Sequence, residues 1–368
     1  MSNANIVPIT MPKWGLSMQE GKVVEWLAQE GALLKLGDQV VDIETEKIAN
    51  TFEALDAGIL RRIVAQPDEV LPIGALLGVL APAEVSDAEV DEYIAEFQKN
   101  YVPPAPEEGE GSDGFQFIEA GGYKLRYSKM GDGARVIILL HGFGGDAAGW
   151  LFNQGALAAN ATVYALDLPG HGQSSKALND SSVQHLAATV VAFMDALEIA
   201  KAELVGHSLG GAIALQAAVD HPNRVSALAL IGSAGLGAEI NAGYINGFIA
   251  AESRKEMKPL LEQLVADANL INRTLINDIL QFKRIDGVGE ALTAIAKGFQ
   301  DGSRQTVNLR ANLEGLDIPI KVIWGSKDAI IPASHASGLP AKVSVTVLDG
   351  FGHLVQLEAA AEVNKLLA

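Results

Sequence analysis

The stretch Asp42-Ile43-Glu44-Thr45-Glu46-Lys47-Ile48-Ala49-Asn50 decides how the first part of the chain folds. It places one lysine between acidic residues and a small polar run, and apolar residues alternate with polar ones on both sides. Alternation with a period of two is typical of strands, so the lysine falls between two strands. Taken alone, the run also fits a charged, solvated turn, since most clusters of glutamate and lysine are no more than that.

Short β patterns broken by glycine surround this stretch over residues 5–80. Residues 21–26 and 58–64 each begin with glycine and continue as a strand pattern, and Gly37-Asp38 provides a turn. The repeated rhythm predicts a flattened all-β barrel or sandwich of about 75 residues with weak twofold internal similarity.

Three features together resemble lipoyl domains, and the resemblance covers residues 1–81. They are the lysine stretch, the Gly37-Asp38 turn and the loop Met-Pro-Lys-Trp-Gly-Leu-Ser-Met-Gln-Glu-Gly at 11–21. The resemblance implies that Lys47 lies at the tip of a β-hairpin and carries covalently attached lipoate. Biotinyl domains share the fold but place the lysine between two methionines, whereas Glu46 and Ile48 flank it here. Biotin is therefore the weaker alternative.

Composition excludes several classes of protein. The net charge of −18 argues against nucleic-acid binding, which needs a basic face. The chain has no cysteine, which excludes disulfides, thiolate metal sites and a cysteine nucleophile. The first residues lack the basic and apolar regions of a signal peptide. The sequence contains no run of about 18 apolar residues, so we expect no membrane span. We expect a cytoplasmic protein that binds neither nucleic acid nor membrane.

Residues 82–113 are predicted to form an acidic linker between two domains. They hold ten acids and one base, so half of the net charge is concentrated in a segment that should stay solvated. Ser86 and Glu89 have the spacing of a capping box, and apolar residues follow at helical spacing, which predicts a short helix at about 87–99. The Pro-Pro-Ala-Pro run at 103–106 favours polyproline conformation.

Residues 114–368 alternate strand and helix patterns. Helical patterns at 183–197 and 210–219 separate the strands, which predicts a mostly parallel sheet with helices on both faces. A helical insertion at 235–312 breaks the alternation, and we expect it to cap the carboxyl edge of the sheet. The predicted strands, most of them apolar runs typical of burial on both faces, lie at 124–127, 135–140, 162–166, 202–205, 225–231, 321–324 and 343–348.

The pentapeptide Gly206-His207-Ser208-Leu209-Gly210 lies between a predicted strand and a predicted helix. In this context Gly-x-Ser-x-Gly is typical of a nucleophile elbow, a turn so tight that side chains beside the serine would collide. The turn places Ser208 at a helix N-terminus, whose dipole favours a developing anion. Asp328 and His353 each follow a later predicted strand.

Serine, acid and histidine in that chain order resemble the α/β-hydrolase family, and so do the loops at 141–145 and 167–174. The resemblance implies that His353 takes the Ser208 proton and that Asp328 orients the imidazolium. It also implies that the backbone N–H groups of Phe143 and Leu209 stabilise the oxyanion.

Three further expectations concern this predicted site. Asp167 is an alternative triad acid, but Asp328 is favoured because it lies after the later strand. His141, His171 and His207 are expected to brace the site by hydrogen bonds. No spacing typical of metal ligands is present, so we expect no metal.

Taken together, the two domains resemble the E2 subunit of acetoin dehydrogenase complexes over the whole chain. The resemblance implies that a thiamin-diphosphate-dependent E1 loads acetyl onto the lipoyl group of Lys47 and that the second domain transfers it to coenzyme A. A flavin-dependent dihydrolipoamide dehydrogenase, E3, would then reoxidise the arm. We expect a homo-oligomer, although the sequence does not indicate the number of copies.

Other functions remain compatible with these residues. The chain could be a lipoyl-tethered hydrolase of esters or thioesters, or a carrier and scaffold with a vestigial triad. Direct attack by the coenzyme A thiol, without an acyl-Ser208 intermediate, also stays open. Arg254, Lys255 and Lys258 could pair with the phosphates of coenzyme A, but a solvated helix face is the simpler interpretation.

Overall fold

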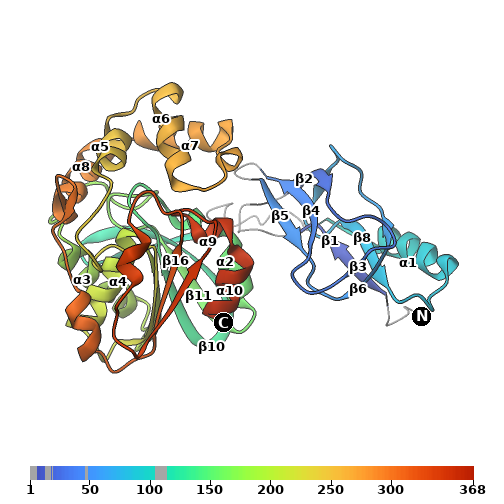
Figure 1. The fold of residues 1–368 in the computed structure, drawn as a ribbon, viewed down its shortest axis with the longest axis horizontal. Helices are drawn as coiled ribbons and strands as arrows, with labels where there is room; N and C mark the ends of the chain where they lie inside the picture. Colours follow the sequence, from blue (N-terminus) through green and yellow to red (C-terminus); the bar gives the residue numbers. More distant parts are fainter. Residues whose placement is uncertain (1–5, 13–17, 19, 46–48, 104–113) are drawn as a thin grey trace. The chain divides into compact units, whose positions relative to one another are not determined.

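A computed structural model of the chain separates two compact units, Met1–Asp113 and Gly114–Ala368 (Figure 1). The structure describes residues 6–12, 18, 20–45, 49–103 and 114–368. No helix in this described part of the chain is long and apolar enough to cross a membrane.

The first unit consists of two antiparallel sheets. One sheet has the strand order β1-β8-β6-β3 and the other has the order β5-β4-β2-β7. The all-β architecture predicted for this part of the chain is therefore confirmed. The strands are β1 (Val7–Thr10), β2 (Glu20–Trp26), β3 (Leu33–Leu34), β4 (Gln39–Glu44), β5 (Ala49–Glu53), β6 (Gly58–Ile63), β7 (Val70–Pro72) and β8 (Leu76–Ala81).

Apolar side chains of the two sheets meet in one core. Val23 of β2, Ile43 of β4 and Leu60 of β6 are fully buried there, as alternation along each strand predicts. A Cβ atom at Gly21 would lie 2.8 Å from Met11 Sδ and 2.9 Å from Ile43 Cγ2. Glycine at this position therefore allows the neighbouring side chains to close the core.

The strands on either side of Lys47 are paired with each other. Glu44 of β4 lies opposite Ala49 of β5 in an antiparallel register. Across the same pair, the Thr51 hydroxyl donates to Asp42 Oδ1 over 2.6 Å. Lys47 itself lies outside the described residues.

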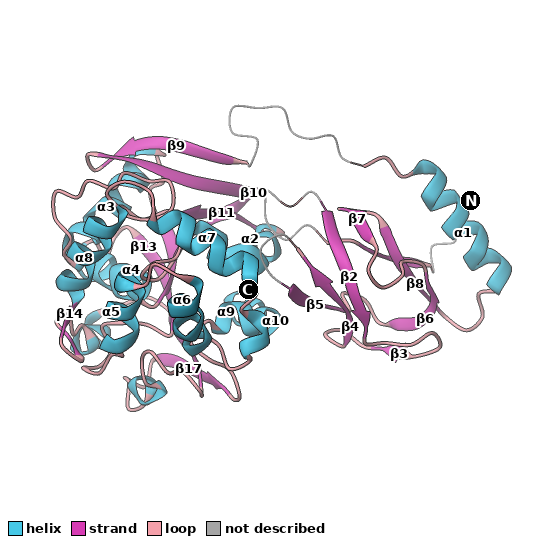
Figure 2. Cartoon of the chain, turned by 90° about the horizontal axis from the view of Figure 1, so that it is seen from above, coloured by secondary structure: helices cyan, strands magenta, loops and turns pink. Residues whose placement is uncertain are grey.

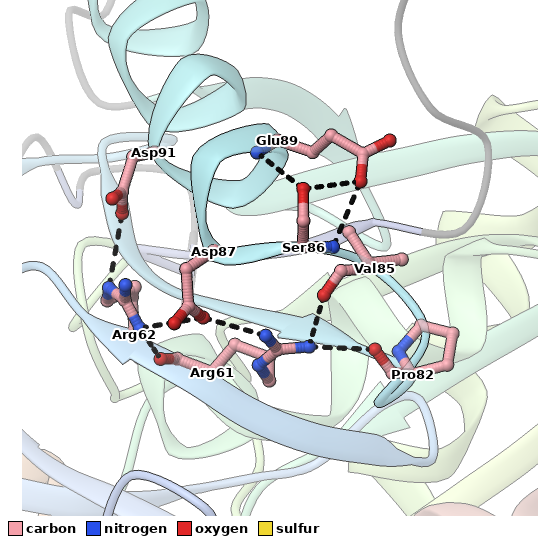
Figure 3. A network of polar contacts seen from close by, with 8 residues as sticks. All are labelled: Arg61, Arg62, Pro82, Val85, Ser86, Asp87, Glu89 and Asp91. Atoms are coloured by element: carbon pink, nitrogen blue, oxygen red, sulfur yellow. Dashed lines mark hydrogen bonds and ion pairs between the residues drawn. The ribbon is translucent and has the colours of Figure 1, made fainter.

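The helix predicted in the acidic segment is present as α1 (Asp87–Asn100), and its capping box is confirmed. Ser86 Oγ accepts from Glu89 N, and the Glu89 carboxylate accepts from Ser86 N over 2.9 Å (Figure 3). Val90 is fully buried against the β-unit, in a small apolar cluster with Leu76 and Val79 of β8.

Polar contacts accompany this packing. Arg61 donates to the carbonyl oxygens of Pro82 and Val85 over 2.8 Å and 2.9 Å. It also pairs with Asp87 over 2.8 Å, while Arg62 pairs with Asp91 over 3.2 Å (Figure 3). The acids lie on the exposed side, where ion pairs contribute little, so the apolar contact is the stronger part of the interface.

The segment predicted as a linker packs on the β-unit as far as Tyr101. The Tyr101 hydroxyl donates to the Ile73 carbonyl over 2.7 Å, beyond the end of α1. A capped helix with one apolar side can bury that side, which the acidic composition of the segment does not reveal. Residues 104–113, including most of the predicted polyproline run, lie outside the described residues.

Val90→Ala should release α1 from the β-unit. Two buried methyl groups are lost at a fully packed site, and we expect a cost of about 1–3 kcal/mol. Hydrogen exchange of the α1 amides should speed up by about tenfold for each 1.4 kcal/mol lost. Glu92→Ala, an exposed change on the same helix, is the matched control. Equal protection of α1 in both variants would show that the helix is not held by this contact.

The second unit is built on a seven-stranded sheet with the path β11-β10-β12-β13-β16-β17, and β9 pairs with β10. The pairs along the path are parallel, except that Tyr127–Met130 of β10 run antiparallel to β11. β9 is antiparallel to β10, and the two lie side by side in Figure 2. The strands are β9 (Phe115–Ala120), β10 (Tyr123–Leu140), β11 (Ala161–Leu166), β12 (Ala202–His207), β13 (Val225–Ile231), β16 (Ile320–Gly325) and β17 (Val343–Leu348).

The two strands expected at 124–127 and 135–140 both lie within β10. They pair with β11 on its two sides, because Leu166 lies opposite Tyr127 in the first half and opposite Leu140 in the second. The first half is antiparallel to β11 and the second half is parallel to it. The chain therefore reverses around Gly131, whose φ is +73°, and the prediction of two strands is confirmed.

Helix layers cover both faces of this sheet (Figure 1). Ile138 and Leu140 of β10 pack in the same core as α3 and α4, while Ile137 and Leu139 face a second core with α2, α9 and α10. Alternate residues of one buried strand thus serve two layers, as its continuous apolar run predicts. The helices are α2 (Leu151–Ala158), α3 (Val183–Ala196), α4 (Leu209–Asp220), α9 (Val355–Glu358) and α10 (Ala360–Leu367).

The insertion between β13 and β16 forms a helical cap, drawn in yellow and orange in Figure 1. Phe248, Leu261 and Leu292 of the cap belong to the same apolar core as α3 and α4. Its helices are α5 (Ala242–Ala250), α6 (Arg254–Leu261), α7 (Arg273–Lys283) and α8 (Val288–Phe299). The short strands β14 (Gln300–Asp301) and β15 (Arg304–Gln305) follow α8.

The remaining helical turns of the second unit are short 3₁₀ segments. They are η1 (Ala147–Trp150), η2 (Glu262–Leu264), η3 (Ala268–Leu270), η4 (Arg310–Gly315) and η5 (Ala333–Ala336).

Candidate active site

Ser208 occupies the turn between β12 and α4, as the sequence predicts. Its φ and ψ are 54° and −117°. A positive φ is strained for a residue with a side chain and costs on the order of 1–3 kcal/mol. Hydrogen bonds hold the turn in place, since Ser208 N donates to the Ile231 carbonyl over 2.9 Å and the Ser208 carbonyl accepts from Ala234 N over 3.0 Å.

The glycines on both sides of Ser208 are required by close backbone contacts. A Cβ atom at Gly206 would lie 2.2 Å from the Gly210 carbonyl oxygen. A Cβ atom at Gly210 would lie 2.3 Å from the carbonyl oxygen of Leu140, at the end of β10. The elbow is therefore fitted against the neighbouring strand with no room for side chains.

His353 and Asp328 are in contact, in the loops that follow β17 and β16. His353 Nδ1 lies 2.7 Å from Asp328 Oδ2, and both side chains are almost completely buried. Asp328 Oδ1 accepts from the backbone N–H groups of Ile330 and Ile331 over 2.8 Å and 2.9 Å. The carboxylate is thus fixed on one side by backbone donors and holds the imidazole on the other.

The elbow also contacts the histidine loop directly. Nε2 of His207, the residue before the serine, lies 3.0 Å from the His353 carbonyl oxygen. The His207 and His353 rings lie with their centroids 4.6 Å apart. The bracing role predicted for His207 is confirmed, but its partner lies 146 positions away and could not be read from the sequence.

Asp167, the alternative acid, has a different role. It is fully buried and pairs with Arg126 Nε over 2.6 Å. Its two oxygens also accept from Ala147 N and Gln173 N, each over 2.8 Å. Asp167 therefore ties β10, the start of the 3₁₀ turn Ala147–Trp150 and the loop at Gln173 together, while the contact with His353 belongs to Asp328.

The two residues predicted for the oxyanion hole lie beside the elbow. Leu209 is the first residue of α4. A Cβ atom at Gly142, next to Phe143, would lie 3.0 Å from Ser208 Cβ, so this loop passes close to the serine. The Phe143 ring packs against Phe248 of the cap, with the centroids 6.0 Å apart.

Glu358 of α9 connects the histidine loop with the cap. Its Oε2 accepts from Gly352 N and its Oε1 accepts from Ala266 N, both over 2.6 Å. Beside these contacts, Leu354 N donates to the Leu264 carbonyl over 2.9 Å. Sequence reasoning missed this group, because one acid on a short amphipathic helix gives no signal of its partners.

No three histidine, aspartate or glutamate side chains within the described ranges form a group that could hold a metal ion. Ser208, His353 and Asp328 are residue types suited to nucleophilic and general acid–base chemistry, with the serine buried.

Two curated relatives match the chain along nearly its full length. The dihydrolipoyllysine-residue acetyltransferase component of the acetoin cleaving system from Cupriavidus necator is 49% identical, over 98% of this chain and 96% of that protein. The protein of the same name from Pseudomonas putida is also 49% identical, over 98% of this chain and 97% of that protein. The chain belongs to this acetyltransferase family. The family resemblance stated from the sequence is therefore confirmed.

Matches to single domains agree with this acetyltransferase family. Residues 135–360 match the family described as alpha/beta hydrolase fold, and residues 7–80 match the one described as biotin-requiring enzyme. A solved meta-cleavage product hydrolase from Pseudomonas fluorescens superposes with a TM-score of 0.62 and 25% identity, covering 68% of this chain and 95% of that one. The predicted fold class is confirmed for both units.

The buried histidines should make the second unit sensitive to acid. Burial lowers the pKa of His141, and it lowers the pKa of His171 and His207 well below the usual value. The unfolded chain then binds protons at pH values where the folded chain does not. Stability is present above about pH 6.5 and is lost as the pH falls from there toward the lowered values, by at most about 1.4 kcal/mol per pH unit for each histidine.

Urea unfolding followed by tryptophan fluorescence between pH 7.5 and 5.5 tests this expectation. His171→Gln should reduce the loss of unfolding free energy on the acid side by about the contribution of one histidine. His221→Gln, a change at an exposed histidine, should leave the slope as it is. The explanation fails if His171→Gln and the unsubstituted chain lose stability in parallel.

Proposed function

We propose that the chain transfers acetyl from a lipoyl group on Lys47 to coenzyme A, with Ser208 as the nucleophile. In this proposal His353 is the general base and acid, and Asp328 orients it. The backbone N–H groups of Phe143 and Leu209 stabilise the oxyanion. The observation that carries the proposal is the buried 2.7 Å contact between His353 and Asp328, in a chain of this acetyltransferase family.

The residues around Lys47 fit the attachment of lipoate. The paired ends of β4 and β5, Glu44 opposite Ala49, flank the lysine as a hairpin would. The Thr51–Asp42 hydrogen bond of 2.6 Å fixes this strand pair close to its end. When attached, the group supplies acetyl as a thioester.

In the first half of the reaction, His353 removes the proton of Ser208 Oγ while the oxygen attacks the thioester carbonyl. The N–H groups of Phe143 and Leu209 donate to the oxyanion, and each such donor typically contributes about 2.7–4 kcal/mol. The carbon–sulfur bond breaks, and His353 gives its proton to the leaving sulfur. An acetyl-Ser208 ester remains.

In the second half, His353 removes the proton of the coenzyme A thiol, and the sulfur attacks the acetyl carbonyl. The ester bond to Ser208 breaks, and His353 returns the proton to Oγ. Acetyl-CoA leaves, and the enzyme is restored. Throughout, Asp328 stabilises the imidazolium through its contact with Nδ1.

Transfer to a thiol requires that water reach acetyl-Ser208 slowly. The cap contributes apolar surface close to the elbow, because Phe143 contacts both Phe248 and Phe299, with centroids 6.0 Å and 5.7 Å apart. His353 is 3% exposed. Both features support a site from which bulk water is largely excluded.

The names of the relatives describe a component of an acetoin cleaving system, and partner enzymes follow from that. We propose that a thiamin-diphosphate-dependent E1 supplies the acetyl group to Lys47. A flavin-dependent dihydrolipoamide dehydrogenase, E3, would reoxidise the dithiol after each transfer.

Ser208→Ala should lower acetyl transfer by roughly 10⁴–10⁶-fold, since the nucleophile is lost while the surrounding donors remain. Lipoylation, measured by intact mass, should not change. Ser344→Ala, at an exposed position of β17, is the matched control and should stay fully active. Full activity of Ser208→Ala, together with rapid-quench mass spectra of the unsubstituted chain that show no acetylated Ser208, would rule out the covalent route.

Asp328→Asn should leave the fold intact but lower the transfer rate by about 10⁴-fold, because the imidazole loses the charge that orients it.

Product analysis of the unsubstituted chain, with and without coenzyme A, separates transfer from hydrolysis. Acetyl-CoA as the main product supports the proposal, whereas acetate formed at the same rate in both conditions identifies a tethered hydrolase.

A further inference from the structure

An open pocket of about 530 Å³ lies in the cap, between α6 and the start of α7. Cations line it from both helices: Arg254, Lys255 and Lys258 of α6 and Arg273 of α7. Glu262 is the acid in the lining. The pocket is therefore strongly positive in a chain whose net charge is −18.

The positive charge is concentrated rather than general. Bases and acids are equally frequent in the cap, nine of each over residues 235–312. Lys255 and Lys258 are exposed, and Lys258 lies 3.6 Å from Glu262. Arg254 Nε donates to Asn277 of α7 over 2.6 Å, which holds the two helices together beside the pocket.

The pocket also has an apolar surface. Ile271, between η3 and α7, and Ile276 of α7 line it and are 7% and 5% exposed. A rim of arginine and lysine with an apolar floor fits a ligand that combines phosphates with a flat ring. The simpler interpretation of α6 from sequence is a solvated helix face. Such a face would not bring together Arg273 and Ile276 of α7 and Ile271 of the preceding turn.

We propose that this pocket binds the nucleotide end of coenzyme A, with the phosphates at the four cations and the adenine on Ile271 and Ile276. The proposal rests on the proposed function, in which coenzyme A is the acetyl acceptor. Coenzyme A carries a 3′-phosphate and a diphosphate at this end and the reactive thiol at the other. The pocket would therefore anchor the molecule away from the reacting atoms.

The backbone connects the pocket with the catalytic histidine. Glu262 lines the pocket, and Leu264, two residues on, accepts from Leu354 N over 2.9 Å. Two residues of chain cover at most about 7 Å. Leu354 follows His353, so the pocket lies beside the loop that carries the general base. A pantetheine arm leaving the pocket along this loop would bring the thiol toward His353.

The test uses the full-length lipoylated chain and the triple variant Lys255→Gln/Lys258→Gln/Arg273→Gln. The matched control is Lys201→Gln/Lys297→Gln, which removes two exposed lysines outside the pocket. Binding of coenzyme A and of adenosine 3′,5′-bisphosphate is measured by calorimetry at low and high salt. Acetyl transfer is measured separately with coenzyme A, dephospho-coenzyme A and pantetheine as acceptors.

The triple variant should weaken binding of both nucleotides by more than about tenfold, the effect of losing one charge-assisted hydrogen bond. KM for coenzyme A should rise by a similar factor at unchanged kcat, while KM for pantetheine stays the same. Added salt should weaken binding to the unsubstituted chain more than to the variant. The control should match the unsubstituted chain.

The outcomes separate the pocket from the proposed function. In one outcome the unsubstituted chain releases acetate instead of acetyl-CoA, yet it binds both nucleotides and the triple variant does not. The pocket assignment is then supported, and the proposed transfer to coenzyme A is wrong. If acetyl-CoA forms and the triple variant keeps its affinity and KM, the pocket assignment is overturned. It is also overturned if neither nucleotide binds to the unsubstituted chain at millimolar concentration.

Discussion

The close backbone contact between the elbow and β10 is the constraint on which the second unit depends. Gly206 faces the carbonyl of Gly210, and Gly210 faces the carbonyl of Leu140, at distances that leave no space for a side chain. Only this fit lets α4 begin immediately after β12 with Ser208 at a positive φ. Hydrogen bonds to β13 and the segment after it hold the strained residue in place, so the surrounding sheet over-determines its conformation.

The positions of the proposed catalytic residues were predictable, because chain order and strand ends carry the information. Ser208, Asp328 and His353 each follow a strand whose apolar run is visible in the sequence, and parallel strands bring their carboxyl ends to one edge. The capping box of α1 was equally visible, since all of its members lie within four residues. The positions of Phe143 and Leu209 beside the elbow follow from the same strand order.

Other features depend on contacts between distant segments and could not be predicted. Docking of α1 requires Asp87 and Val90 to meet Arg61 and the apolar side chains of β8, which only the folded β-unit brings together. The pocket in the cap needs Arg273 to lie across from α6, and helix periodicity does not show how two helices pair. Asp167 was ambiguous for a similar reason, because its buried pairing with Arg126 joins positions 41 residues apart. Lys47 lies outside the described residues, so its assignment rests on sequence and family.

The contacts of Glu358 and Leu264 make the cap and His353, the proposed general base, mechanically dependent on each other. One carboxylate spans Gly352 and Ala266, and one backbone hydrogen bond joins Leu354 to Leu264. A cap that lifts away from the sheet along this seam must break these bonds or pull His353 with it. Each bond contributes about 1 kcal/mol or more, so opening carries a free-energy cost that the closed, reactive arrangement does not. In the proposed mechanism, access to Ser208 and the alignment of the His353 imidazole would then depend on the same equilibrium, and a substrate that draws the cap closed would also position the base.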